Sequence, residues 1–350
     1  MPSTAVMQRS AIIEAPGKVV VIDTPLRGLT AGETRVEIAY SGICGSDLHN
    51  IDNQSNDQLK ALGRRVTPGH EQSGVVVEVA DGVSDFAVGT RVCVLPRVPC
   101  GKCDLCRRGK IGNCRNMRRP DSGSWAETMS VDQAFLVRLP ETLSLREAAL
   151  AEPTACVLRA IDRAAIEPGA SALIIGSGPM GLILAQLLPL CGIKKVLVSE
   201  PHPERRRLAA ATGARVFDPS EGDLVDWVRG ETGSLGVDVA FEAAGFAFTV
   251  EQAIQSAAVG GTVVVLGVAS PSAISGISPH LIFDRELTIR GAWGVETTFT
   301  RAVTLLDRLD LENIITHVFG LEEAADAVSI SRDGSSGKVL IQPNRKLATQ

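Results

Sequence analysis

Two short segments of the chain place a thiol, two imidazoles and two carboxylates within 28 residues: GICGSDLH at 42–49 and PGHE at 68–71. Thiolate and neutral imidazole are preferred ligands of Zn²⁺, and a catalytic zinc takes three protein ligands and leaves a fourth position for water or substrate. Cys44 and His70 are therefore candidate ligands of a catalytic metal, and the third ligand must come from another part of the sequence.

A second group of thiols follows. Four cysteines fall within 15 residues, namely Cys100, Cys103, Cys106 and Cys114. Four thiolates complete the tetrahedron of a structural zinc and leave no open position. Cationic neighbours such as Lys102 and Arg107 favour the thiolate form. Two disulfides or unused thiols are the alternatives, but we expect the lobe at 97–116 to hold a structural zinc, so that the subunit carries two zinc ions.

A glycine-rich turn indicates a nucleotide site. The apolar run 172–175 leads into Gly176-Ser177-Gly178-Pro179-Met180-Gly181, and the apolar stretch 182–190 follows. Between a strand and a helix, these glycines allow a tight turn and close backbone approach to a pyrophosphate, which binds at the helix N-terminus.

The choice of cofactor is predicted from Glu200, which follows Gly181 by 19 residues at the end of the next expected strand. A carboxylate there accepts hydrogen bonds from the ribose hydroxyls and repels a 2′-phosphate, so NAD is expected rather than NADP. Arg205 and its neighbours at 206–207 could neutralise a 2′-phosphate, although a solvated helix face is the favoured explanation for them.

Length and composition exclude several classes of protein. A chain of 350 residues is expected to form two domains. The net charge of −5 lacks the basic signature of nucleic-acid binding. The apolar runs are too short to span a membrane, and residues 1–9 do not resemble a signal peptide. We therefore expect a cytoplasmic protein with no nucleic-acid or membrane partner.

The pattern of elements changes along the chain. Residues 9–139 read as short strands, 142–162 as helices, and from 171 strands and helices alternate, as in a doubly wound parallel sheet. A tail follows with helices at 300–308 and 322–330 and a strand at 338–342. We predict an α/β protein with a β-rich, barrel-like catalytic domain at 1–160, a Rossmann domain at 161–292, and a return to the catalytic domain at 293–350.

These motifs, in this order, resemble the zinc-dependent branch of the medium-chain dehydrogenase/reductase superfamily, which contains alcohol, polyol and threonine dehydrogenases. The resemblance covers nearly the whole chain and implies a GroES-like catalytic domain interrupted by an NAD-binding domain. Glu152-Pro153 is similar to the sorbitol and butanediol dehydrogenase branch, which implies that Glu152 is the third zinc ligand. Cys156, four residues further on, is an alternative ligand.

The resemblance also implies roles for neighbouring residues. Ser46 and His49 match a relay that carries the released proton to solvent, Asp47 a carboxylate that orients His70, and Glu71 a group beside the metal. A turn residue, a surface imidazole and local ion-pair partners are the alternatives. Further positions match cofactor-binding residues: Gly176, Gly178, Pro179, Met180, Gly181, Glu200, Arg205, Gly245, Leu266 and Val268.

The sequence thus predicts a zinc-dependent oxidoreductase that reversibly oxidises a secondary alcohol or polyol to a ketone by hydride transfer to NAD, as a homodimer or homotetramer. Oxidation of L-threonine or another amino or anionic alcohol is the alternative. A zinc-free double-bond reductase and a non-catalytic Rossmann binding protein are less favoured. Polar residues at 50–66 and arginines at 115, 118 and 119 would fit an anionic or highly hydroxylated substrate, or simply solvated loops.

Overall fold

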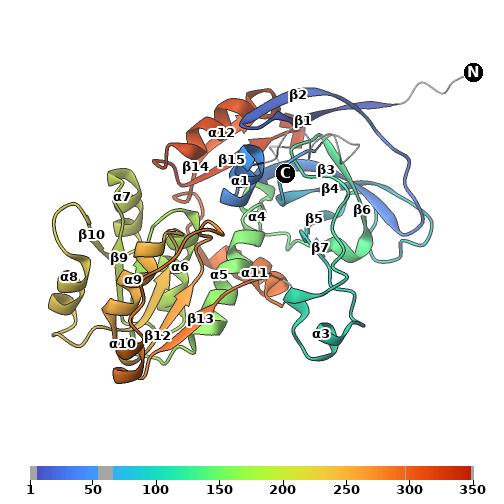
Figure 1. Ribbon diagram of the computed structural model, residues 1–350. Helices are drawn as coiled ribbons and strands as arrows, with labels where there is room; N and C mark the ends of the chain where they lie inside the picture. The colour runs from blue at the N-terminus through green and yellow to red at the C-terminus, as the bar shows by residue number, and fades with distance from the viewer. Residues whose placement is uncertain (1–5, 54–65, 296, 348–350) are drawn as a thin grey trace, which may run out of the picture.

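The computed structural model describes residues 6–53, 66–295 and 297–347. Figure 1 shows two units, with the amino-terminal strands and the carboxy-terminal segment in one and the strands and helices of the middle of the chain in the other. The polar segment 50–66 that was considered for the substrate lies mostly outside the described residues.

The first unit is built from β-strands. A hairpin of β1 (Met7–Ala15) and β2 (Lys18–Pro25) packs beside a larger sheet. That sheet has the order β14-β15-β3-β4-β5-β7, and β6 pairs with β3 outside this path. Its strands are β3 (Glu33–Gly42), β4 (Glu71–Val79), β5 (Arg91–Val94), β6 (Thr128–Asp132), β7 (Leu136–Arg138), β14 (Ile315–Gly320) and β15 (Lys338–Gln342).

The carboxy-terminal strands complete this sheet. β15 pairs antiparallel with β3, where Leu340 lies opposite Gly42 and Ile341 opposite Ser41. The end of the chain therefore lies against the strand that leads directly into Cys44. Helix α12 (Ala324–Arg332) packs on β15 and on the hairpin strand β2 (Figure 1).

The second unit is a six-stranded sheet of order β10-β9-β8-β11-β12-β13 in which every pair is parallel. This is the 3-2-1-4-5-6 order of a Rossmann fold, which binds its ligand where the order reverses, here between β8 and β11. The strands are β8 (Ser171–Ile175), β9 (Lys195–Ser199), β10 (Arg215–Phe217), β11 (Val237–Glu242), β12 (Ala257–Val265) and β13 (Thr288–Gly291).

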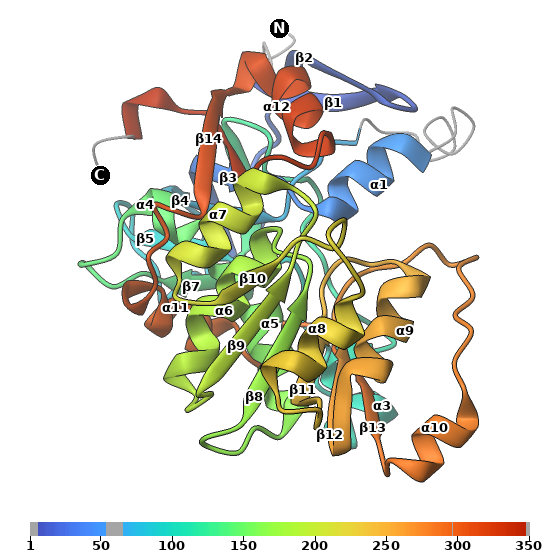
Figure 2. The same cartoon turned by 90° about the vertical axis from the view of Figure 1, so that its left-hand side faces the viewer.

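Helices cover this sheet, as Figure 2 shows. They are α6 (Pro179–Leu190), α7 (Pro203–Ala211), α8 (Leu224–Glu231) and α9 (Ala247–Ser256), whereas the short helix α10 (Pro279–Asp284) precedes β13. Helix α7 ends as the sequence suggests: Gly213 follows the terminal Thr212 with φ of +88°, a left-handed conformation that glycine adopts without strain.

Helix α5 (Ala151–Ala164) joins the two units. It contacts β4 of the first sheet, β12 of the second, and helices α6 and α11 (Phe299–Leu305). Before it, α4 (Leu145–Ala148) begins with a capping box, in which Ser144 and Glu147 satisfy each other's free backbone N–H groups. One apolar core includes Tyr40 and Val75 from the first sheet and Phe241 from the second. Within the described ranges, the remaining helices are α1 (Gly45–Asn53), α3 (Asp104–Arg107) and five short 3₁₀ turns, at Ile111–Asn113, Gln133–Phe135, Leu306–Arg308, Leu321–Glu323 and Arg345–Leu347.

The predicted α/β fold class, with a barrel-like unit and a doubly wound parallel sheet, is confirmed. The strands expected at 195–199 and 338–342 have those bounds. Helix α1 and strand β14 were not anticipated. The domain boundaries at 160 and 292 remain predictions. Within the described ranges, no helix combines the length and apolar character that crossing a bilayer requires.

Candidate active site

The metal-ligating side chains predicted from the first two motifs lie together. Cys44 directly precedes α1, His70 directly precedes β4, and Glu71 is the first residue of that strand. One ligand atom from each of these three residues lies within 4.8 Å of the others. Two segments that are 26 positions apart in sequence thus form one donor cluster at the end of the sheet.

Asp47 fixes the imidazole of His70. Its Oδ1 lies 3.2 Å from His70 Nδ1 and accepts a hydrogen bond from Gly69 N at 3.1 Å, while Oδ2 accepts one from Cys44 N at 3.0 Å. A carboxylate can only accept, so Nδ1 carries the proton and Nε2 presents its lone pair to a metal. The predicted contact between Asp47 and His70 is present, and it selects the tautomer that a metal ligand needs.

Electrostatics support this pair. Burial raises the pKa of Asp47, but the charge of His70 and three hydrogen bonds outweigh it, and the net pKa lies below the usual value. For His70, burial lowers the pKa, yet the carboxylate of Asp47 and the neighbouring Cys44 raise it well above 6.5. In the metal-free protein the imidazole therefore holds a proton that a metal ion must displace.

Glu71 is held by a lysine from the end of the chain. Lys338 Nζ lies 2.6 Å and 2.8 Å from the two carboxylate oxygens and also donates to Ile43 O at 3.0 Å. Both side chains are buried, with 3% and 1% exposed. Lys338 was not identified from the sequence, because nothing near residue 338 resembles a site.

Glu152 lies at the start of α5 and is buried. Cys156 Sγ donates to its Oε1 at 3.4 Å. Burial raises the pKa of Glu152, and the charge of nearby His70 opposes this shift. The tight donor cluster contains Glu71 rather than Glu152, so the carboxylate that ligates the metal is not decided by proximity alone.

Ser46 and His49 both lie in α1 with exposed side chains. Residues three apart in a helix share one face, so the two polar groups are neighbours on the surface of the first turns. Asp47, between them, is turned into the protein instead. This helix was not anticipated, yet its geometry separates the relay candidates from the residue that orients the ligand.

The four-cysteine lobe fits a zinc ion. The four sulfur atoms all lie within 4.8 Å of one another, and Cys103 Sγ is 3.9 Å from Cys114 Sγ. Zn–S bonds of about 2.3 Å in a tetrahedron place sulfur atoms about 3.8 Å apart, whereas a disulfide requires about 2.05 Å. Every cysteine in the part of the chain described here is a free thiol. The disulfide alternative is therefore not supported.

The glycine turn has the shape of a phosphate-binding loop. Gly176 has φ of +93°, and a Cβ there would come within about 3.1 Å of Ala244 in the loop after β11. A Cβ at Gly181 would lie 2.0 Å from the carbonyl oxygen of Gly176. Gly178 is the N-cap of α6, with Pro179 and Met180 in its first turn. The turn lies at the reversal of strand order, where a dinucleotide binds.

Glu200 lies beside this turn at the end of β9 and is buried. Its Oε2 accepts a hydrogen bond from Ser177 N at 2.7 Å, and its Oε1 accepts one from His202 N at 3.0 Å. Arg205 extends over Gly178 and donates from Nε to Ser336 O at 2.7 Å. Its pKa is lowered, because burial outweighs the attraction of Glu200.

The remaining predicted cofactor residues also meet. Gly245 has φ of +81°, and a Cβ there would lie 2.9 Å from Val268 O. Leu266 and Gly267 both donate backbone hydrogen bonds to Glu242 O. The Glu242 carboxylate was overlooked in the sequence. It is fully buried, and its Oε1 accepts hydrogen bonds from Ala244 N, Gly245 N and Thr249 Oγ1, which holds the loop after β11 in place.

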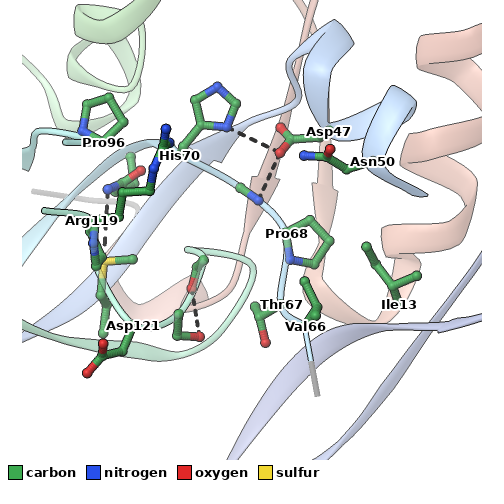
Figure 3. Close-up of a pocket in the computed structure, with 16 residues that line it drawn as sticks. Ile13, Asp47, Asn50, Val66, Thr67, Pro68, His70, Pro96, Arg119 and Asp121 are labelled. Carbon is green, nitrogen blue, oxygen red and sulfur yellow. Dashed lines mark hydrogen bonds and ion pairs between the residues drawn. The ribbon is translucent and has the colours of Figure 1, made fainter. Parts of the chain in front are cut away.

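A cavity of about 210 Å³ lies beside His70. Figure 3 shows it between α1, which carries Asp47 and Asn50, the segment that leads to His70, and the loop with Arg119 and Asp121. The cavity therefore joins the donor cluster to the region whose arginines were noted in the sequence.

Comparison with known protein families agrees with this site. Residues 30–141 match the alcohol dehydrogenase GroES-like domain, and residues 179–308 match the family described as zinc-binding dehydrogenase. The two matches correspond to the β-rich unit and to most of the Rossmann unit with the segment that follows it.

Individual relatives cover nearly the whole chain. Sorbitol dehydrogenase of Bacillus subtilis is 28% identical, over 96% of this chain and 98% of that protein. The 2-dehydro-3-deoxy-L-galactonate 5-dehydrogenase of Pseudoalteromonas atlantica is 33% identical, over 90% and 92%. A crystal structure of a zinc-binding dehydrogenase from Sinorhizobium meliloti bound to NADP is 33% identical, with a TM-score of 0.88 over 97% of this chain and 100% of that one.

A GroES-like domain joined to a Rossmann domain, with a cysteine, histidine and carboxylate cluster, defines a metal-dependent dehydrogenase. The chain belongs to the zinc-dependent alcohol dehydrogenases of the medium-chain dehydrogenase/reductase superfamily. It is an alcohol oxidoreductase that uses zinc and a nicotinamide cofactor and acts on a small molecule.

Proposed function

We propose that this protein reversibly oxidises a secondary alcohol or polyol to a ketone, with NAD as hydride acceptor and a catalytic zinc held by Cys44, His70 and Glu152. The observation that carries the proposal is the imidazole of His70, which Asp47 holds with Nε2 free beside the thiol of Cys44. Zinc, when bound, supplies Lewis acidity to the reacting oxygen, and the nicotinamide supplies the hydride acceptor.

The charges of the donor set favour Glu152 over Glu71 as the third ligand. Glu71 already has a full countercharge, because Lys338 contacts both of its oxygens. Glu152 is buried and receives only a weak thiol donor from Cys156. The thiolate of Cys44 and the carboxylate of Glu152 together balance a divalent cation, and Glu71 remains a neighbour of the metal, neutralised by Lys338.

Ser46 and His49 are proposed to carry the proton that leaves the alcohol. Both lie on the exposed face of α1, immediately after Cys44. The hydroxyl of Ser46 can accept and pass on a proton, and the imidazole of His49 can exchange one with solvent near neutral pH. Both proposed relay groups therefore lie in α1, the helix that also carries Asp47, which orients His70.

NAD rather than NADP is proposed because the carboxylate of Glu200 is fixed next to the phosphate-binding turn. A 2′-phosphate there would meet a buried negative charge. Gly245, Leu266 and Val268 lie together across the strand-order reversal and are proposed to contact the cofactor through their backbone. The second zinc is proposed to bind the lobe formed by Cys100, Cys103, Cys106 and Cys114.

A homodimer or homotetramer is also proposed. β13 is an edge strand of the Rossmann sheet, and edge strands offer unpaired backbone groups to another chain. Exposed apolar side chains occur in β13 and in segments near it in sequence, namely Val259, Ile274, Phe283 and Ile289. Exposed apolar surface of this kind favours association with a second copy. A cytoplasmic location is proposed as well.

The test combines metal analysis with NADH formation over a panel of secondary alcohols, polyols and amino alcohols. Cys44→Ser and His70→Ala are expected to abolish turnover and lower zinc from about two ions per chain to about one. Cys191→Ser, remote from both clusters, serves as the control. If Cys44→Ser retains activity, the site assignment fails; if L-threonine alone is oxidised, the polyol assignment fails. A non-catalytic binding protein would take up cofactor without turnover, and a double-bond reductase would not need zinc.

A further inference from the structure

The cavity beside His70 has features that select a class of substrate. It is lined by His70 and Gln72 from the start of β4, Asn50 from α1, Thr67, Pro96, and Arg119 from the loop that precedes β6. In Figure 3, Arg119 lies across the cavity from Asn50, and His70 lies between them. A molecule that occupies this cavity would therefore contact the metal ligand and these polar groups together.

Gln72 presents a buried acceptor to the cavity. It lies two residues after His70, and both residues line the cavity. Its side chain is almost fully buried, and its Nε2 donates to Val94 O at 3.3 Å. Its Oε1 is buried and has no hydrogen-bond partner among the residues described. An unpaired buried carbonyl is unfavourable, so a hydroxyl donor from a bound molecule would satisfy it.

Arg119 supplies an available positive charge at the rim of the same cavity. Its side chain is exposed, and no carboxylate in residues 6–53, 66–295 and 297–347 pairs with it. Its neighbour Arg118 differs, because it pairs with Asp132 at 2.9 Å and lies over the ring of Phe135. The sequence placed these arginines together, but only the structure separates them.

The acidic groups of the cavity are already engaged. Asp47 accepts hydrogen bonds from Gly69 N and Cys44 N and contacts His70. Asp121 pairs with Arg27 at 3.3 Å. Among the residues that the structure describes, the guanidinium of Arg119 has no carboxylate partner in the lining of the cavity. A guanidinium is a planar set of donors that matches a carboxylate in a bidentate arrangement.

We propose that the substrate is a polyhydroxylated carboxylic acid, whose carboxylate binds Arg119 and one of whose hydroxyl groups donates to Gln72 Oε1. This inference rests on the proposed function and narrows its substrate class. The reaction is unchanged: the secondary alcohol carbon transfers a hydride to NAD, the hydroxyl proton leaves to solvent, and a keto acid and NADH are formed.

The experiment uses the zinc-loaded enzyme and compares a set of six-carbon aldonates with the matching neutral alditols. The wild type is expected to have a higher kcat/KM for an aldonate than for its alditol. Arg119→Gln should lower kcat/KM for the aldonate about 10- to 100-fold, mainly through KM, and leave the alditol unchanged. Arg118→Gln removes the same charge one residue away and should change neither substrate.

Gln72→Met tests the hydroxyl contact with a side chain of similar volume. It should lower kcat/KM for the aldonate about tenfold and have no effect on a deoxy analogue that lacks the contacting hydroxyl. The thermal midpoint of each variant shows whether it is folded. A variant that unfolds is replaced by Arg119→Ala or Gln72→Leu, which remove the same charge or the same acceptor, and the same loss for the aldonate is expected.

The outcomes separate this inference from the proposed function. Turnover of neutral secondary alcohols or alditols with no preference for the acid would leave the proposed function intact and overturn the inference. Equal losses for acid and alditol in Arg119→Gln would also overturn it. If no alcohol of any charge is oxidised with NAD or NADP, the proposed function fails and the inference fails with it.

Discussion

Lys338 Nζ lies 2.6 Å from Glu71 Oε2, although the two residues are 267 positions apart in the sequence. The contact joins the first residue of β15 to the first residue of β4, and Glu71 also belongs to the donor cluster. Both groups are almost completely buried, so water cannot solvate either charge. A residue near the end of the chain therefore contributes to the net charge of the metal site.

We predict that Lys338→Met destabilises the protein by about 3–5 kcal/mol, because it leaves the Glu71 carboxylate buried without a countercharge. The free energy of unfolding in urea checks this. The double variant Lys338→Met with Glu71→Gln removes both charges and should recover most of the loss. A single variant as stable as the wild type would show that the pair is not needed to offset the buried carboxylate.

This pair also shows what could be predicted from the sequence and what could not. Cys44, His70 and the four cysteines lie in short motifs whose spacing carries their chemistry, so they were found without the fold. Lys338 was not, because its partner is set by the pairing of β15 with its neighbours in the first sheet, a long-range contact that no local pattern encodes. Gln72 was missed for a similar reason. A glutamine in a strand does not indicate a binding site until the cavity that it lines is known.

The positions of most Rossmann strands were predictable, because apolar runs alternate with helical ones, but β10 was not predicted. Helix α1 was not predictable, because its sequence GSDLHNIDN is short and polar and its buried residues are Asp47 and Ile51.

The carboxylate that ligates the zinc is a different case. Glu152 comes from the resemblance to the polyol dehydrogenases, whereas the geometry brings Glu71 into the tight cluster. Here the charge of the donor set, rather than proximity or sequence pattern, favours Glu152 over Glu71 as the zinc ligand.

Asp47→Asn should lower zinc affinity at the catalytic site about 10- to 100-fold. All three contacts of the Asp47 carboxylate are with nitrogen atoms, Cys44 N, Gly69 N and His70 Nδ1. An amide would place its own N–H₂ against at least one of these donors and would no longer favour the required tautomer of His70. Competition with a chromogenic chelator measures the affinity.

The matched control for this variant is Asp52→Asn, the same substitution in the same helix. Asp52 forms an exposed ion pair with Arg332 and takes no part in the donor cluster. Its zinc affinity should equal that of the wild type. If Asp47→Asn also retains full affinity, the orientation of His70 does not depend on the carboxylate.

The zinc affinity of the four-cysteine lobe should fall as the pH falls, and more steeply below about pH 6, where Cys100 also becomes protonated. Backbone N–H groups of Lys102 and Cys103 lower the pKa of Cys100 to about 6, so its thiolate persists above that pH and is protonated below it. Desolvation raises the pKa of Cys106 to about 12, so at neutral pH zinc must displace a proton from this thiol. Zinc uptake near pH 7 is therefore expected to release protons.

The Cys44→Ser variant, which is expected to retain only the lobe zinc, allows this measurement without interference from the catalytic site. Dialysis against a chelator at about pH 5.5 and pH 7.5, followed by metal analysis, gives the retained zinc, and less zinc is expected at the lower pH. Equal retention at both values would contradict the expected competition between protons and zinc at Cys100.

NAD should be preferred to NADP by about 100-fold in kcat/KM, because a 2′-phosphate would approach the buried carboxylate of Glu200. The neighbouring arginines do not offset this charge. Arg205 donates from Nε to Ser336 O, and Arg206 pairs with Asp218 at 2.6 Å. Arg207 pairs with Glu204 at the surface.

Glu200→Ser removes the carboxylate and should reduce the preference for NAD at least tenfold, through a higher KM for NAD and a lower KM for NADP. Glu204→Ser, an exposed position in the first turn of α7, is the control for the loss of one acidic residue and should leave the preference unchanged. Kinetics with both cofactors decide the matter. A wild-type enzyme that prefers NADP would contradict the role proposed for the Glu200 carboxylate.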